Sequence, residues 1–133
     1  MALVDTSVLI RYLIGDRPDL TEAVRSFVED TESLVLSEVV IAEAAYVLTS
    51  NYGLPREAVV DGLVGLLRRG NVETLSTPTD LVIDALALCR PSGRVSFADA
   101  LVWAAARAAG RGTVVYSLDR RFPAQEIDLR HPA

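Results

Sequence analysis

Apolar positions follow two kinds of pattern along this chain. Compact apolar runs predict short buried strands, and they occur at residues 2–4, 33–36, 72–75, 113–116 and 127–129. Between these runs lie longer stretches in which apolar residues recur at the spacing of a helix face. The longer stretches predict helices at residues 7–14, 18–30, 38–51 and 55–69, from 78 to before Pro91, and from 97 to before Gly110.

No two neighbouring strands are joined by the short turn of a β-hairpin. Parallel strands need long crossover connections, and the predicted helices supply them. The order therefore predicts an α/β fold with a parallel sheet of four to five strands and helices on both of its faces. At 133 residues, without a repeat, low-complexity tract or linker, the chain is expected to form one domain over residues 1–133.

Four carboxylates interrupt the apolar stretches singly. Asp5 and Asp119 each follow a predicted strand, whereas Glu43 and Asp99 lie in the early turns of predicted helices. Helical spacing surrounds Glu43 with apolar neighbours, so we expect it on or beside the buried face. Because the functional crevice of an open parallel sheet lies beyond the carboxyl ends of its strands, we expect the four acids to converge there.

Carboxylates packed together in an apolar setting repel one another, which raises their pKa values. A divalent cation removes this conflict, and an all-oxygen site suits Mg²⁺ or Mn²⁺. Such a cation binds a phosphodiester oxygen, lowers the pKa of its bound water and stabilises the developing negative charge. Arg11, Arg120 and Arg121 are candidates for holding a phosphate backbone at the mouth of this site.

Composition excludes several other chemistries. The chain has no lysine, and its only histidine is His131 near the C-terminus, which nearly excludes a catalytic lysine, a histidine base or a histidine-rich zinc site. The net charge of −5 argues against a general electrostatic binder of nucleic acid. Asp5 stands where a signal peptide is basic, Cys89 is alone, and no apolar run approaches the roughly 20 residues that span a bilayer, so we expect a cytoplasmic protein.

Four segments resemble the PIN-domain ribonucleases, specifically the VapC toxins of bacterial toxin–antitoxin pairs. These segments are Val4–Ser7, Ser37–Glu43, Ser96–Leu101 and Ser117–Phe122. The resemblance covers nearly the whole chain and implies a PIN-like three-layer α/β/α fold. It implies that Asp5, Glu43 and Asp99 form the metal-binding core and that Asp119 is a more variable fourth acid, which often acts through water. Thr6 and Ser117 match hydroxyl positions that support the acidic site.

The activity that this resemblance implies is a Mg²⁺- or Mn²⁺-dependent endoribonuclease that inhibits translation by cutting RNA. It also implies a VapB antitoxin, whose C-terminal segment would lie in an apolar groove and push a basic residue toward the acidic pocket. A homodimer, and a hetero-oligomer with the antitoxin, are expected. The apolar helices near the N-terminus are candidates for the antitoxin groove and for the homodimer surface. The sequence does not reveal which RNA is cut or how many metal ions are bound.

Other functions are weighed against this one. A haloacid-dehalogenase-like phosphatase or a receiver domain also has an aspartate after its first strand. The phosphatase pattern, however, needs a second aspartate where this chain has Ser7, and both classes use a lysine. A non-catalytic PIN-like binding module would use the acids only as structural caps, and the retention of all four argues against it. A Ser-His-Asp hydrolase would have to use His131 in the tail.

Overall fold

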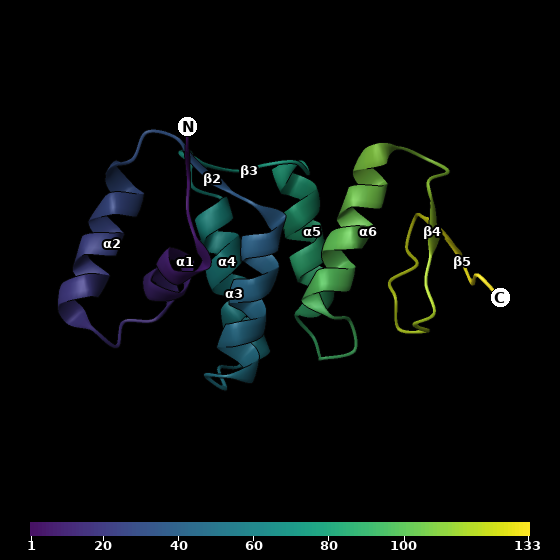
Figure 1. Ribbon diagram of the computed structural model, residues 1–133, viewed down its shortest axis with the longest axis horizontal. Coiled ribbons are helices and arrows are strands. Elements are labelled where there is room, and N and C mark those ends of the chain that lie inside the picture. The colour runs from purple at the N-terminus through teal and green to yellow at the C-terminus, as the bar shows by residue number, and fades with distance from the viewer.

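The computed structural model describes residues 1–133 and contains six helices and five short strands (Figure 1). The strands are β1 (Ala2–Leu3), β2 (Leu34–Leu36), β3 (Val72–Thr74), β4 (Val114–Tyr116) and β5 (Asp128–Arg130). The helices are α1 (Thr6–Leu13), α2 (Pro18–Asp30), α3 (Glu38–Ser50), α4 (Arg56–Leu67), α5 (Thr79–Cys89) and α6 (Phe97–Ala109). Every predicted element is present, with ends that differ by at most a few residues, and the α/β class is confirmed.

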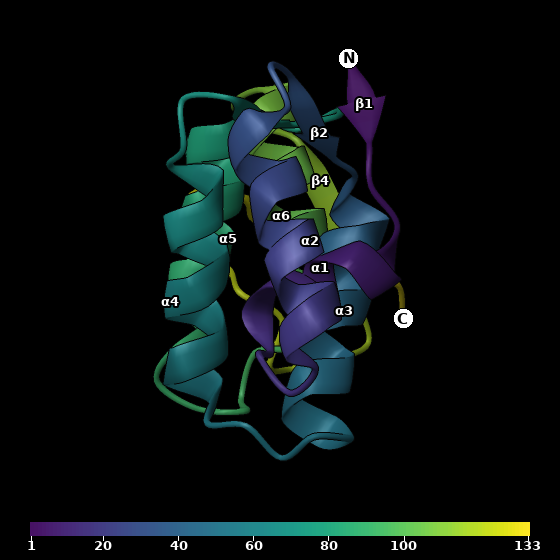
Figure 2. The same ribbon diagram turned by 90° about the vertical axis from the view of Figure 1, so that its left-hand side faces the viewer.

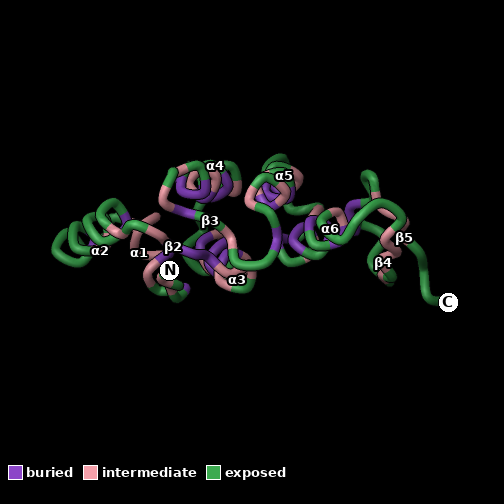
Figure 3. The backbone as a smooth tube through the Cα atoms, turned by 90° about the horizontal axis from the view of Figure 1, so that it is seen from above, coloured by how far each residue is buried: buried purple, intermediate pink, exposed green.

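All strand pairs are parallel, as predicted, but the strands are divided between two sheets. One sheet has the order β1-β2-β3, and the second pairs β4 with β5. Figures 1 and 3 place the second sheet beyond α6, on the side away from β1. The structure thus differs from the predicted continuous sheet of four to five strands, because β4 does not lie beside β1.

Contacts with α6 hold β4, β5 and their connection in this place. The indole N–H of Trp103 donates to the backbone oxygen of Gln125 at 2.8 Å, and Arg107 forms an ion pair with Glu126 at 2.8 Å. Phe122, between the two strands, is buried. We call residues 113–130 the β4–β5 unit, and Trp103 and Arg107 of α6 anchor it.

Serine hydroxyls cap the first turns of two helices. Ser37 Oγ accepts a hydrogen bond from the backbone N–H of Val40 at 3.3 Å at the start of α3, and Ser96 Oγ accepts one from Asp99 at 3.0 Å at the start of α6. Such caps satisfy backbone donors that have no partner within the helix. Gly110 follows the last residue of α6 with a φ of 122°. This backbone conformation is unfavourable for any residue that has a Cβ, which explains the glycine.

The hydrophobic core lies where α3, α4, α5 and α6 face one another (Figure 3). Leu48 of α3, Leu63 of α4 and Leu86 of α5 are almost wholly buried. Complete burial of a leucine side chain contributes about 1.5–3 kcal/mol. None of the helices has both the length and the apolar character needed to cross a membrane.

The end of α5 contains the sole cysteine. Cys89 is buried, and its Sγ lies 3.7 Å from the backbone oxygen of Ser96. Burial raises the pKa of this thiol to about 11. The prediction of an unpaired cysteine in an apolar helical pattern is confirmed.

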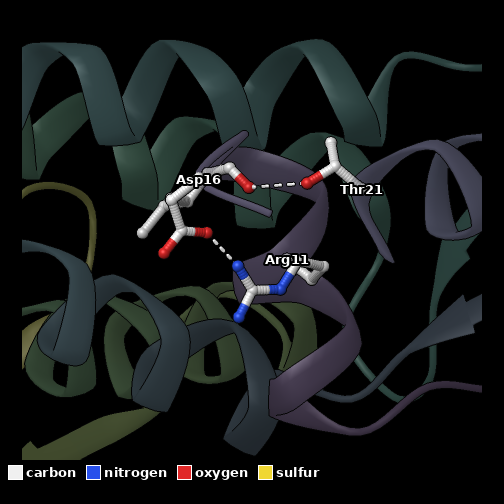
Figure 4. A network of polar contacts seen from close by, with 4 residues as sticks. Arg11, Asp16 and Thr21 are labelled. Atoms are coloured by element: carbon white, nitrogen blue, oxygen red, sulfur yellow. Dashed lines mark hydrogen bonds and ion pairs between the residues drawn. The ribbon is translucent and has the colours of Figure 1, made fainter. Parts of the chain in front are cut away.

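The first two helices form a hairpin on the outside of the helical layer. Figure 1 shows α1 between α2 and the pair formed by α3 and α4, in agreement with the contacts of α1, and Figure 2 looks onto this side of the molecule with α2 in front. Arg11 of α1 forms an ion pair with Asp16 in the connecting turn, and the hydroxyl of Thr21 donates to the backbone oxygen of Ile14 at 3.5 Å (Figure 4). These contacts close the turn between the two helices.

Candidate active site

Asp5 lies between β1 and α1, at the end of the first strand, as predicted. Its carboxylate is exposed and accepts a hydrogen bond from the hydroxyl of Ser7 at 3.0 Å. This bond, with support from the backbone N–H groups of Thr6 and Ser7, lowers the pKa of Asp5 below its ordinary value of 3.8. The prediction of a buried strand before Asp5 is wrong in part, because Leu3 is exposed at the sheet edge.

Glu43 lies in the second turn of α3 with its side chain exposed. Its expected place on or beside the buried face is therefore wrong. Helix α3 is apolar on several faces, and Ile41, Ala44 and Ala45 are the neighbours that turn into the core. No hydrogen bond or ion pair engages the Glu43 carboxylate, which leaves it free to bind a cation or a ligand.

Asp99 lies in the first turn of α6, as predicted. The backbone N–H of Asp99 donates to Ser96 Oγ, while no hydrogen bond or ion pair of the structure engages its carboxylate. The side chain is half-buried. The partial positive charge of a helix N-terminus favours a carboxylate at this position.

Asp119 follows β4 in the β4–β5 unit and is exposed. Its Oδ1 accepts a hydrogen bond from the backbone N–H of Arg121 at 2.8 Å, and Ser117 Oγ accepts one from the backbone N–H of Asp119 at 3.0 Å. Ser117 and Asp119, together with Arg120 and His131, line a hollow of about 220 Å³. Ser117 therefore holds the turn that carries Asp119.

The four acids do not come together as the sequence led us to expect. In this structure no group of three or more carboxylate, histidine or cysteine side chains is arranged to hold a metal ion. Asp119 belongs to the β4–β5 unit, which lies beyond α6 and on the side away from β1 (Figure 1). The donors fit Mg²⁺ or Mn²⁺ in chemical kind, since all four are hard oxygen ligands. Their positions here do not form such a site.

The three arginines proposed from the sequence as phosphate contacts differ in their surroundings. Arg11 is engaged by Asp16, so its charge is already paired. The exposed side chains of Arg120 and Arg121 make no hydrogen bond or ion pair within the chain. Of the three, the arginines beside Asp119 are those whose charge remains available to a phosphate.

A cavity of about 570 Å³ lies between α3 and the start of α6, with Glu43 in its wall. Two further lining residues, Tyr46 and Arg56, were missed as functional candidates from the sequence. The sequence does contain a sign that Arg56 has a special role. A positive charge in the first turn of a helix is unfavourable beside the helix dipole, so such an arginine needs another partner. Tyr46 is one of the apolar neighbours that helical spacing places beside Glu43, and its side chain is exposed.

Comparison with known proteins identifies one family. The sequence pattern of the family described as PIN domain matches residues 2–127, which is nearly the whole chain. No curated protein matches the chain.

Proposed function

Because this chain belongs to the PIN domain family, we propose that it is a VapC-type toxin, a Mg²⁺- or Mn²⁺-dependent endoribonuclease. Family membership by itself indicates a nuclease, that is, a hydrolase that acts on nucleic acid and generally uses divalent metal ions. The ion, the RNA substrate, a cytoplasmic site of action and the toxin role are the parts that we propose. The haloacid-dehalogenase-like phosphatase is not favoured, since a different family matches.

The observation that carries this proposal is the chemistry of the isolated acids within a chain of this family. Glu43 and Asp99 have carboxylates without any partner in the chain, and Asp5 is bound only to a hydroxyl and backbone N–H groups. No lysine is available to neutralise them. An external cation is therefore the partner that such acids can bind.

From the chemistry of their oxygen donors, and not from their spacing in this structure, we propose that Asp5, Glu43 and Asp99 would hold the metal ion, with Asp119 as a fourth acid. A bound divalent cation would supply positive charge at the phosphodiester and lower the pKa of the attacking water. The chain's own groups hold the acids in place. Ser7 and the backbone of α1 keep Asp5 ionised, Ser96 fixes the turn that carries Asp99, and Thr6 and Ser117 are the supporting hydroxyls.

The proposal includes two protein partners, a VapB-type antitoxin and a second copy of the chain. Exposed apolar side chains on the N-terminal helices support a partner surface there, since Leu20 and Phe27 both lie exposed on α2. Large exposed apolar residues that cluster on one element are typical of binding surfaces. An antitoxin segment in this region would cover apolar surface that is exposed in the free chain.

The test is cleavage of total cellular RNA, with the cut sites mapped by sequencing. We expect Mg²⁺-dependent cleavage by the parent and its loss in Asp5→Asn and Asp99→Asn. Asp84→Asn serves as the matched control, because Asp84 is an exposed aspartate of α5 whose side chain makes no hydrogen bond or ion pair. Full activity of Asp5→Asn, or of the parent in excess chelator, would overturn the proposal.

A second measurement addresses the role of Glu43. We expect Glu43→Gln to weaken binding of Mn²⁺, followed by calorimetric titration, without lowering the stability of the metal-free protein. Exposure of the side chain supports this expectation, because no buried charge is removed. If Glu43→Gln unfolds the metal-free chain, the residue has a structural role and the assignment fails.

A further inference from the structure

The cavity beside Glu43 has the size and lining of a small-ligand site. Its volume is about 570 Å³, within the range of roughly 300–1,000 Å³ that is usual for ligand pockets. Its walls come from α3, the start of α4 and the segment that leads into α6. Apolar and aromatic residues alternate there with a few polar groups, which are Glu43, Thr49, Ser50, Arg56 and Ser96.

Tyr46 presents an aromatic ring to this cavity from a rigid element. It lies three residues after Glu43, which places both side chains on the same face of α3. The side chain is 63% exposed, and no hydrogen bond engages its hydroxyl. An exposed ring held on a helix is a suitable platform for a nucleobase, because every base has a flat face that stacks on an aromatic side chain.

Arg56 brings a fixed positive charge to the same cavity. Its guanidinium donates to the backbone oxygens of Cys89 and Val95, and its Cζ lies 4.2 Å from the ring centroid of Phe97. No carboxylate forms an ion pair with it, so its charge is not neutralised within the chain. A guanidinium has five N–H donors, and those not bound to the two carbonyls can donate to a phosphate.

We propose that this cavity binds one unpaired nucleotide of an RNA strand, with the base stacked on Tyr46 and a phosphate beside Arg56. The Ser96 hydroxyl, which accepts from a backbone N–H, can still donate its proton to a base or ribose oxygen. Glu43 in the same wall places this nucleotide next to one of the acids that we assign to cleavage, so the inference rests on the proposed function. The strand has to be single, because a paired and stacked base does not offer its face.

Binding of a fluorescein-labelled RNA of mixed sequence, measured by anisotropy in the Asp5→Asn background, tests this inference without cleavage. Loss of a stacking ring weakens binding by about 5- to 150-fold per base, so we expect Tyr46→Ala to raise Kd at least fivefold. Tyr46→Phe keeps the ring and should bind within twofold of the background. Tyr52→Ala is the matched control, because Tyr52 is 48% exposed and lies outside the cavity lining.

Three results would overturn the inference. They are an unchanged Kd in Tyr46→Ala, an equal loss in Tyr52→Ala, and an equal loss when the labelled RNA is a duplex. Circular dichroism melting of each variant confirms that the fold is kept. If the parent chain does not cut RNA but Tyr46→Ala still loses single-strand binding, the proposed function fails while the binding site stands. If the parent cuts RNA and Tyr46→Ala binds normally, the binding site fails while the proposed function stands.

Discussion

Replacing Arg56 by methionine removes a side chain that ties three parts of the fold together. Its guanidinium, at the start of α4, bonds the last carbonyl of α5 and the carbonyl of Val95, and it covers the ring of Phe97. Methionine has a similar length and helix propensity but no donor. The substitution therefore isolates the contribution of these polar contacts.

The magnitude follows from the contacts. A hydrogen bond from a charged donor contributes about 1.5–3 kcal/mol, and a partly exposed cation–π contact adds about 0.5–1 kcal/mol. Arg56 is half-buried, so water can reach part of the carbonyl surface that the substitution frees. We therefore expect the free energy of unfolding to fall by about 2–4 kcal/mol, and Tm to fall by roughly 10 °C for a chain of this length.

Urea denaturation followed by circular dichroism measures this change. Arg25→Met is the control, because Arg25 is an exposed arginine of α2 without a hydrogen bond or ion pair. We expect Arg56→Lys to recover only part of the stability, since one ammonium cannot reproduce the two-pronged guanidinium. A loss below about 1 kcal/mol in Arg56→Met, or an equal loss in the control, would refute the reasoning.

Three further predictions concern the N-terminal half. Ser7→Ala removes the hydroxyl that lowers the pKa of Asp5, so that pKa should rise toward 3.8 in a carboxyl ¹³C NMR titration. Because the folded-state pKa is depressed, this contribution to stability is present above about pH 4 and is lost as the pH falls through the folded pKa; an unchanged titration would contradict it. Gly65→Ala should stabilise α4 by about 0.5–1 kcal/mol, since its new Cβ meets no atom within 4 Å. Gly62→Ala should raise Tm by less than Gly65→Ala does, because its Cβ would lie 2.9 Å from Leu13 Cδ2. A larger rise in Tm for Gly62→Ala would show that the Leu13 side chain moves aside without cost.

Local signals in the sequence were enough to predict the elements. Ser37 and Ser96 each cap the helix that was expected to follow, and Pro18 begins α2 as predicted. Each of these signals involves residues only a few positions apart, so the sequence alone shows which backbone groups the capping side chain can reach. The bounds of the elements followed from them.

Long-range arrangement was harder to predict. The apolar run of α3 contains Val39 and Tyr46, which are exposed, beside Ile41, which is buried, so its pattern did not show which face turns inward. The place of β4 depends on the hydrogen bond from Trp103 of α6 to the β4–β5 unit and on the burial of Phe122 within that unit, and no local pattern encodes either. Convergence of the acids was argued from one shared sheet, and the division into two sheets removes that argument.

The buried sulfur of Cys89 gives this chain a native chemical reporter of local motion. Only the thiolate attacks alkylating reagents, and with a pKa of about 11 the thiolate is a minute fraction at neutral pH. Reaction therefore requires that the junction of α5 and α6 opens, and its rate measures how often it does so. The thiol donates to the backbone oxygen of Ser96, which caps the turn carrying Asp99, so slow alkylation would report that this candidate acid lies on a rigid support.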